Sequence, residues 1–388
     1  MRQAKHILFY IILLSVFLPS ISKAQELVQD QISVMRAKVV EVVNQAEKIL
    51  PWNETKIQSQ TLKVEILEGD EKGQEIIFDN DYVMLKAGDS FYLSRSTQFE
   101  GKEIYSVHDP DRAPMLFLFA IIFIILVLVF GGIQGFRGLL SLAGSLLVIL
   151  FVLLPAIMKG FSPLLVSIGV SSIIIIFGSY ITHGFNKTTS SAVFGMIATV
   201  IITGVMAYFA VYSSYLTGVV DDEAAYLNFN TVGGIDLVGL LMGAIMIGLL
   251  GVLYDVAIGQ SISVEELHTI APHVGRWEIY KRAIRIGREH IGALVNTLAI
   301  AYVGASLPLL LLFYSSADAN FLMIINREVF ATEIIRILIG SIGLVLAVPI
   351  TTLLAVLMLI KKEERQLPAE VLAKEEIALT HFEHEHKH

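Results

Sequence analysis

A carboxylate, Asp255, stands at the end of the apolar run GLLMGAIMIGLLGVLY, where the sequence predicts a helix that crosses a bilayer. An ionisable group inside such a helix is unfavourable in hydrocarbon and commonly marks an ion or substrate pathway. Asp255 also lies near the end of the span, where a charge costs little. We therefore interpret it either as a group that binds a proton or cation, or as a boundary charge.

A second polar group opens the stretch IGREHIGALVNTLAIAYVGASLPLLLL, which covers residues 286–312. Arg288, Glu289 and His290 are consecutive, so they point in different directions around a helix and at least one should face the bundle. Asn296 follows inside the apolar part, where its amide needs a partner on a neighbouring helix. Asn296 either holds two helices together or lines a polar path with His290 and Asp255.

The last apolar segment begins NREVFATEIIRILIG and carries Glu328, Glu333 and Arg336. Glu333 and Arg336 are three residues apart, a spacing that permits an ion pair on one helix face. We interpret these three residues either as charges at the membrane interface or as the outer mouth of a cation path.

Two prolines predict helix breaks, Pro308 and Pro349, because proline lacks the N–H that the helical ladder needs. Thr351 or Thr352 could bond the carbonyl that Pro349 leaves free. Broken helices often hold substrate sites in transporters, which makes Thr351 a candidate for the polar path.

Two further segments, HFEHEHKH and residues 256–290, each allow two interpretations of their role. The four histidines of the first could bind Zn²⁺ or Ni²⁺ weakly, or could belong to a solvated tail: His381, His384, His386 and His388. In the second, the spacing predicts a capping box at 263–266 and a basic amphipathic helix over 276–289. That helix either lies on the inner membrane surface or couples to a transport cycle. We expect no fixed metal site and no cofactor.

These residues belong to a membrane protein by composition. Hydrophobic residues make up 55% of the 388 residues and charged residues only 16%, whereas about a quarter is charged in soluble domains. The fold class predicted is an α-helical polytopic membrane protein with about seven spans. The expected spans are 114–132, 138–156, 161–182, 189–213, 234–255, 291–314 and 330–360.

The chain before the spans predicts two further parts. Residues 1–24 read as a basic start, an apolar stretch and a small-residue site, typical of a signal peptide or of an uncleaved anchor helix. Residues 25–112 alternate β-rich segments with turns, which predicts a small extracytoplasmic all-β domain of the OB-like type. We place the transmembrane domain at 113–360 and a cytosolic tail at 361–388.

Charge supports a topology and excludes one class of partner. The β domain holds 17 acidic and 10 basic residues, and no basic excess indicates nucleic acid binding. With this domain outside, most basic residues of short loops lie inside, as the positive-inside rule requires. We expect a protein of the cytoplasmic membrane with a cytosolic C-terminus.

Three stretches carry a family resemblance: GLLGVLYDVAIGQSISVEEL, IGREHIGALVNTLAIAYVGASLPLLLLF and INREVFATEIIRILIGSIGLVLAVPITT. They resemble the YibE/F-like family of bacterial membrane proteins, from the small outer domain through the last span. The resemblance implies an integral membrane protein with an extracytoplasmic N-terminal domain, and it implies no settled activity. The family pattern has Asp where Glu289 stands here, which bears on any role of that carboxylate.

Two functions follow as hypotheses. The first is a secondary transporter or export permease, with coupling to protons as part of the hypothesis, whose solute or ion the sequence does not define. The second is a membrane assembly or signalling component whose outer domain binds a protein partner. An intramembrane enzyme is not expected, because no predicted span holds an HExxH motif, a GxSxG motif or paired carboxylates.

Overall fold

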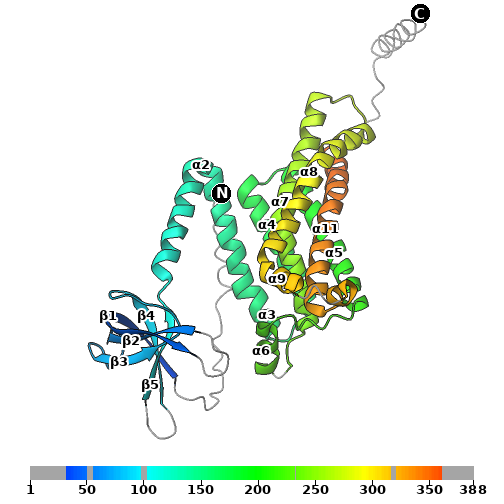
Figure 1. The fold of residues 1–388 in the computed structure, drawn as a ribbon. Coiled ribbons are helices and arrows are strands. Elements are labelled where there is room, and N and C mark those ends of the chain that lie inside the picture. Colours follow the sequence, from blue (N-terminus) through cyan, green and yellow to red (C-terminus); the bar gives the residue numbers. More distant parts are fainter. Residues whose placement is uncertain (1–31, 50–55, 98–102, 232, 316–319, 361–388) are drawn as a thin grey trace, which may run out of the picture. The chain divides into compact units, whose positions relative to one another are not determined.

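The computed structural model of the protein describes residues 32–49, 56–97, 103–231, 233–315 and 320–360 (Figure 1). The chain divides into two compact units between Phe130 and Gly131. The first unit holds a β-sheet and the beginning of a long apolar helix, and the second holds the remaining helices. The predicted signal segment and the four tail histidines lie outside the described residues.

The first unit contains five antiparallel strands in the order β3-β2-β1-β4-β5. The strands are β1 (Ile32–Ile49), β2 (Lys56–Ile66), β3 (Glu75–Asn80), β4 (Ser90–Thr97) and β5 (Glu103–Pro110). β1 pairs with β4 through its first half and with β2 through its second half, and register shifts interrupt the second pairing. Such shifts bend a strand and increase its twist.

The sheet curls, because residues of its two edge strands, β3 and β5, approach within 8 Å between Cα atoms. Its concave side holds the buried side chains Ala37, Val39, Leu62, Val64, Ile66, Leu85, Phe91, Leu93 and Val107. They alternate with exposed residues along the strands, as expected for a sheet with one solvated face. The predicted small β domain is thus confirmed, and its curled five-stranded sheet agrees with an OB-like barrel.

Helix α2 (Ala113–Val148) is interrupted at Gly132, which has φ 53° and ψ −137°. Glycine reaches this region because it has no Cβ. The helix continues through a π-helical turn (Ile149–Leu153) and α3 (Leu154–Met158), so the apolar run covers 46 residues. Such a run would extend about 69 Å, more than twice the hydrocarbon thickness of about 30 Å. The break at Gly132 divides it into two segments, which agrees with the predicted spans 114–132 and 138–156.

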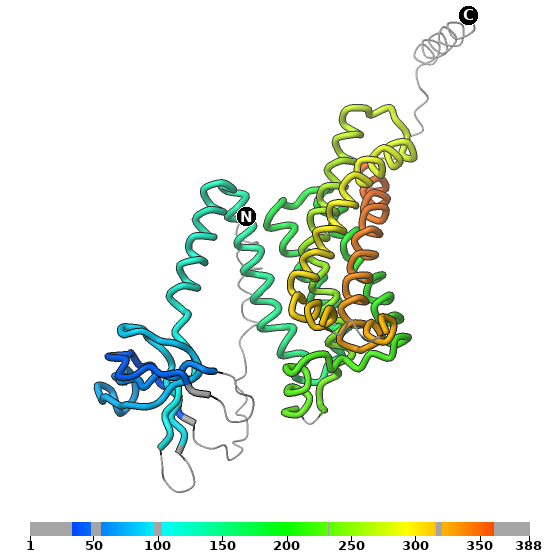
Figure 2. Tube along the Cα trace, viewed as in Figure 1, coloured from blue at the N-terminus to red at the C-terminus, as the bar shows by residue number. Residues whose placement is uncertain are grey.

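The rest of the second unit is a helical bundle, in which α8 and α11 run side by side (Figure 2). Its helices are α4 (Pro163–His183), α5 (Lys187–Ser213), α6 (Asp222–Asn230), α7 (Leu237–Ile270), α8 (Arg276–Ala305), α9 (Leu307–Ser315), α10 (Phe321–Ile325) and α11 (Glu328–Leu359). Among the described residues, five helices are long and apolar enough to cross a membrane, or six if the bent pair α8–α9 is one span. Dividing the first at Gly132 gives the seven apolar segments that the sequence predicts.

Three local predictions need correction. α7 continues through Ser263, whose hydroxyl donates to the carbonyl of Gly259 at 2.8 Å, so the predicted capping box does not form. α8 is one helix from Arg276 to Ala305 rather than a surface helix followed by a separate span. α11 stays helical through Pro349, because it is packed along its length against α5, α7 and α8.

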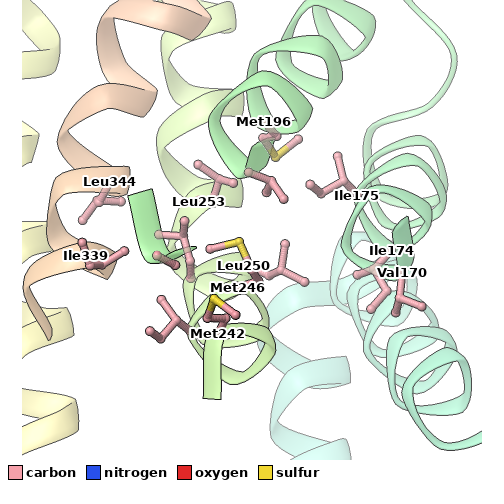
Figure 3. Packing of buried hydrophobic residues seen from close by; sticks show 14 of the residues in the cluster. Val170, Ile174, Ile175, Met196, Met242, Met246, Leu250, Leu253, Ile339 and Leu344 are labelled. Carbon is pink, nitrogen blue, oxygen red and sulfur yellow. The ribbon is translucent and has the colours of Figure 1, made fainter. Parts of the chain in front are cut away.

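Large side chains from α4, α5, α7 and α11 fill the core of the bundle, among them Ile175, Met196, Met246 and Leu344 (Figure 3). Small residues bring the backbones together. A Cβ placed on Gly343 of α11 would lie 2.6 Å from Thr203 Oγ1 of α5. Membrane helices associate through such close contacts, because lipid provides no hydrophobic drive between them.

A separate apolar cluster joins the ends of α7, α8 and α11, through Val264, Ile279, Ala283 and Val356. The guanidinium of Arg276 donates to the carbonyl of Ile360 and so ties the beginning of α8 to the end of α11. This end of the bundle lies near the candidate site described next.

Candidate functional site

A cavity of about 200 Å³ lies between α7, α8 and α11. Its lining residues are Asp255, Val256, Gly259, Gln260, Ser263, His290, Leu294 and Val348. Two of them, Asp255 and His290, are ionisable and come from different helices. The structure therefore brings together two residues that the sequence proposed as parts of one polar path.

Asp255 and His290 suit the binding of a proton or a cation. The carboxylate offers only acceptor oxygens when ionised, and an imidazole can either donate or accept a hydrogen bond through its ring nitrogens. Both side chains are exposed, so the cavity opens to the surroundings of the bundle. Among the described residues, no group of three or more His, Asp or Glu side chains could hold a metal ion.

The wall of the cavity is fixed by Gln260, which is only 3% exposed. Its Oε1 accepts a hydrogen bond from the hydroxyl of Thr352 at 2.8 Å, and this hydroxyl also lies 2.7 Å from the carbonyl of Val348. On the other side, Gly287 of α8 leaves no space for a Cβ, which would lie 2.6 Å from Gln260 Nε2 and from Val348 Cγ1. One amide is thus held by three helices.

The depth of the cavity follows from helix length. Asp255 lies 18 residues beyond Leu237, the first residue of α7, which corresponds to about 27 Å along the axis. A hydrocarbon layer of about 30 Å would therefore place the cavity near one of its faces. This agrees with a carboxylate close to a boundary that still reaches a space inside the bundle.

An ion pair lies further along the same helices. Arg336 Nη1 lies 3.0 Å from Glu333 Oε1, as the spacing predicts, and the side chains are 24% and 19% exposed. Glu333 Oε2 also accepts a hydrogen bond from Ser306 at 3.2 Å. Ser306 sits where α8 and α9 meet at 71°, two residues before Pro308, so the break predicted at Pro308 occurs next to this pair.

The ion pair and the cavity are separated by 12 residues on α11, from Arg336 to Val348. This is about 18 Å along the axis, well inside the thickness of a bilayer. Charged residues at such depth face the interior of a bundle in membrane proteins and are commonly functional. The bundle thus holds two polar regions, the cavity and the ion pair, about 18 Å apart along α11.

Residues 119–361 match the YibE/F-like protein family, and residues 33–97 match the N-terminal domain of the YibE/F family. The chain belongs to the YibE/F family. The second match falls on the curled β-sheet, and the first covers every helix of the second unit. No curated protein and no solved structure matches the chain significantly.

Other predicted residues of this YibE/F protein lie away from the cavity. Arg288, Glu289 and Asn296 are exposed on α8 and do not line it. Glu328 accepts hydrogen bonds from the backbone N–H groups of Thr217, at 2.5 Å, and Gly218, at 2.9 Å. It therefore holds the loop after α5 to the start of α11.

Thr351 is also placed differently from the prediction. It is fully buried at the closest approach of α5 and α11, where a Cβ on Gly195 would lie 2.4 Å from its Oγ1. Its hydroxyl has no hydrogen-bond partner among the described residues. The neighbouring Thr352 is the one that contacts the wall of the cavity. Thr351 is thus a packing residue of the YibE/F bundle.

Sequence reasoning missed Gln260 and Gly287. Gln260 follows Asp255 by five residues, or about one and a half helical turns. It could have been recognised in the sequence as a polar amide in an otherwise apolar helix. Gly287 lies three residues before His290. Its role could not be predicted from the sequence, because the close contact of α8 with α7 and α11 depends on the positions of all three helices.

Proposed function

We propose that this YibE/F protein is a secondary transporter of a small ion or solute, and that the cavity between α7, α8 and α11 is its binding site. The observation that carries the proposal is the convergence of Asp255 and His290 from two helices on one cavity. An intramembrane carboxylate beside an imidazole supports proton exchange and attracts a cation. Gln260 adds a polar wall that is held in place by Thr352.

The coupling follows from charge. When Asp255 is ionised, the cavity attracts a cation, and when the carboxylate is protonated that attraction is lost. Competition between a proton and a cationic substrate for the same carboxylate would couple their movements in opposite directions. This chemistry supports a proton-coupled exchanger and needs no cofactor.

A transporter also needs a part that closes the site from one side at a time. The bend between α8 and α9 at Ser306 is the best candidate, since Ser306 is hydrogen-bonded to Glu333 and His290 lies on the same helix α8. A change in the bend would move α8 relative to α11 and so alter the cavity. Discontinuous helices serve this purpose in several transporter folds.

For the orientation, we propose a bacterial cytoplasmic membrane with the β domain outside and the C-terminus in the cytosol. The support is the distribution of basic residues over the short loops, which favours the cytosolic side for the 183–187 and 270–276 connections. In this orientation the cavity lies near the cytosolic face and the Glu333–Arg336 pair lies near the outer face.

The proposal is tested by proton flux in liposomes that contain purified protein and a trapped pH dye, with divalent metal ions and small anions as candidate substrates. Wild-type protein should show substrate-dependent flux, and Asp255→Asn should abolish it while the protein remains folded. Glu266→Gln is the matched control, because Glu266 is an exposed carboxylate on the same helix that does not line the cavity. Flux that Asp255→Asn leaves unchanged would contradict the proposal.

A second function, a membrane component whose β unit binds a protein partner, is favoured by one observation. Three valines of β1, Val34, Val40 and Val43, are 42–52% exposed on a sheet that has its own complete core. For this function, deletion of residues 25–112 should abolish activity in the cell while Asp255→Asn is silent. A transporter predicts the reverse sensitivity for Asp255→Asn.

A further inference from the structure

The first half of α8 carries a row of cations that face away from the bundle. Lys281, Arg285 and Arg288 are spaced by four and three residues, so they share one side of the helix, and all three are exposed. The buried residues of this segment, Ile279, Ala283 and Gly287, lie on another side. The row is therefore not part of the contact between α8 and its neighbouring helices.

The arginines of this segment fall into two groups. Arg276 is bonded to the carbonyl of Ile360, and Arg282 pairs with Glu278 at 3.1 Å. Arg285 and Arg288, in contrast, have no hydrogen-bond or ion-pair partner within the part of the chain that the structure describes.

Glu289 does not neutralise the two free arginines. It is adjacent to Arg288 and four residues from Arg285, yet no ion pair under 4 Å joins it to either within the described ranges. Two guanidinium groups thus present their donors outward at adjacent turns of one helix. Guanidinium groups of this kind bind phosphate through paired hydrogen bonds.

The position of Arg285 and Arg288 along α8 indicates that the phosphate they bind belongs to a lipid headgroup. α8 continues without a break from Arg288 into the apolar segment that begins at Ile291 and belongs to a candidate span. Arg288 lies about 4.5 Å before Ile291 along the axis and Arg285 about 9 Å. The headgroup layer on each side of a bilayer is about 5–7 Å thick, and an arginine side chain bridges the remaining distance.

We propose that Arg285 and Arg288, with Lys281 beyond them, form a binding site for the headgroup of an anionic phospholipid. The lipid would lie against the outward side of α8 at the face of the membrane nearest the cavity. Basic residues next to a membrane span attract anionic lipids, and each contributes about a fivefold preference over neutral lipids. The site is independent of whether the cavity transports a solute.

The test uses full-length protein in nanodiscs made from equal amounts of phosphatidylglycerol and phosphatidylcholine. Native mass spectrometry of the released protein counts the lipids that remain bound. Wild-type protein should retain phosphatidylglycerol in preference, and the double variant Arg285→Gln/Arg288→Gln should lose about 25-fold of that preference. Arg282→Gln removes one positive charge, that of an arginine paired with Glu278, and should retain the preference.

Two results would overturn the proposal. One is equal retention of the two lipids by wild-type protein. The other is a preference that Arg282→Gln reduces by about fivefold, the same factor per charge removed as in Arg285→Gln/Arg288→Gln, because net charge rather than a site would then explain it. Circular dichroism of each variant in the same nanodiscs checks that the helices are intact.

Discussion

Replacement of Gly195 by alanine tests the packing of α5 against α11. A Cβ at this position would lie 2.4 Å from Thr351 Oγ1, 2.8 Å from its Cβ and 2.9 Å from its Cα. A change of the Thr351 rotamer would remove only the first contact, because the other two atoms are fixed to the backbone. The helices would have to separate by about 0.5 Å to restore an ordinary contact distance of 3.4 Å to the Cα.

The expected loss of stability follows from two opposing effects. Overpacking of a close contact costs about 1–3 kcal/mol, and alanine gains about 0.5–1 kcal/mol over glycine in a helix. Gly195→Ala should therefore lower the free energy of unfolding by up to about 2.5 kcal/mol. Gly251 of α7 is the matched control, because a Cβ there would meet no atom within 4 Å, and Gly251→Ala should raise stability slightly.

The assay is the loss of helical circular dichroism as sodium dodecyl sulfate is titrated into protein in dodecyl maltoside. Thr351→Ala alone should lower stability by about 1 kcal/mol through the loss of a buried γ-methyl group, because the hydroxyl that it also removes has no partner among the described residues. Added to Gly195→Ala it should recover part of the loss. If Gly195→Ala is as stable as Gly251→Ala, the close packing of α5 on α11 is refuted.

Three further predictions concern charges. Glu328→Gln should lower stability by about 1 kcal/mol and speed proteolysis of the loop at Thr217, since its carboxylate holds that backbone; equal cleavage rates would contradict this role. Glu333→Gln should lower the thermal midpoint in detergent by leaving Arg336 unpaired, and Arg336→Gln in the same chain should restore it. The hydrogen bond to Glu103 raises the pKa of Tyr105 to about 12, above the unfolded value of about 10. The β unit should therefore lose stability as pH rises from about 10 to 12, and Tyr105→Phe should remove this dependence.

Periodicity and hydropathy were sufficient to predict the elements of the fold. Each β-rich segment forms a strand. Strands depend on the alternation of apolar and polar residues and on turn residues such as Gly73 and Gly88, and both signals can be recognised within a short stretch of sequence. The apolar segments form helices of span length for the same reason, since a lipid-exposed backbone must satisfy its own hydrogen bonds. The ion pair of Glu333 and Arg336 was predictable because both residues lie on one helix.

Contacts between helices were harder to predict. Asp255 and His290 were correctly placed together, since both lie at the same end of apolar segments that the topology brings to one face. Thr351 was misread, because sequence does not show that Gly195 of another helix faces it. A helix break was predicted at both prolines. At Pro349 the prediction was wrong, because packing on several sides keeps α11 helical. At Pro308 it was correct, since α8 ends at Ala305 and α9 begins at Leu307.

The absence of cysteine from the sequence allows the central claim to be tested at one position. Gly259 lines the cavity and has space for a side chain, so Gly259→Cys should react with a charged thiol reagent in liposomes and the reaction should stop substrate-dependent proton flux. Glu266→Cys, exposed on the same helix but outside the cavity, should react without loss of flux. Complete labelling of Gly259→Cys with unchanged flux would contradict the assignment of the cavity to the transport path.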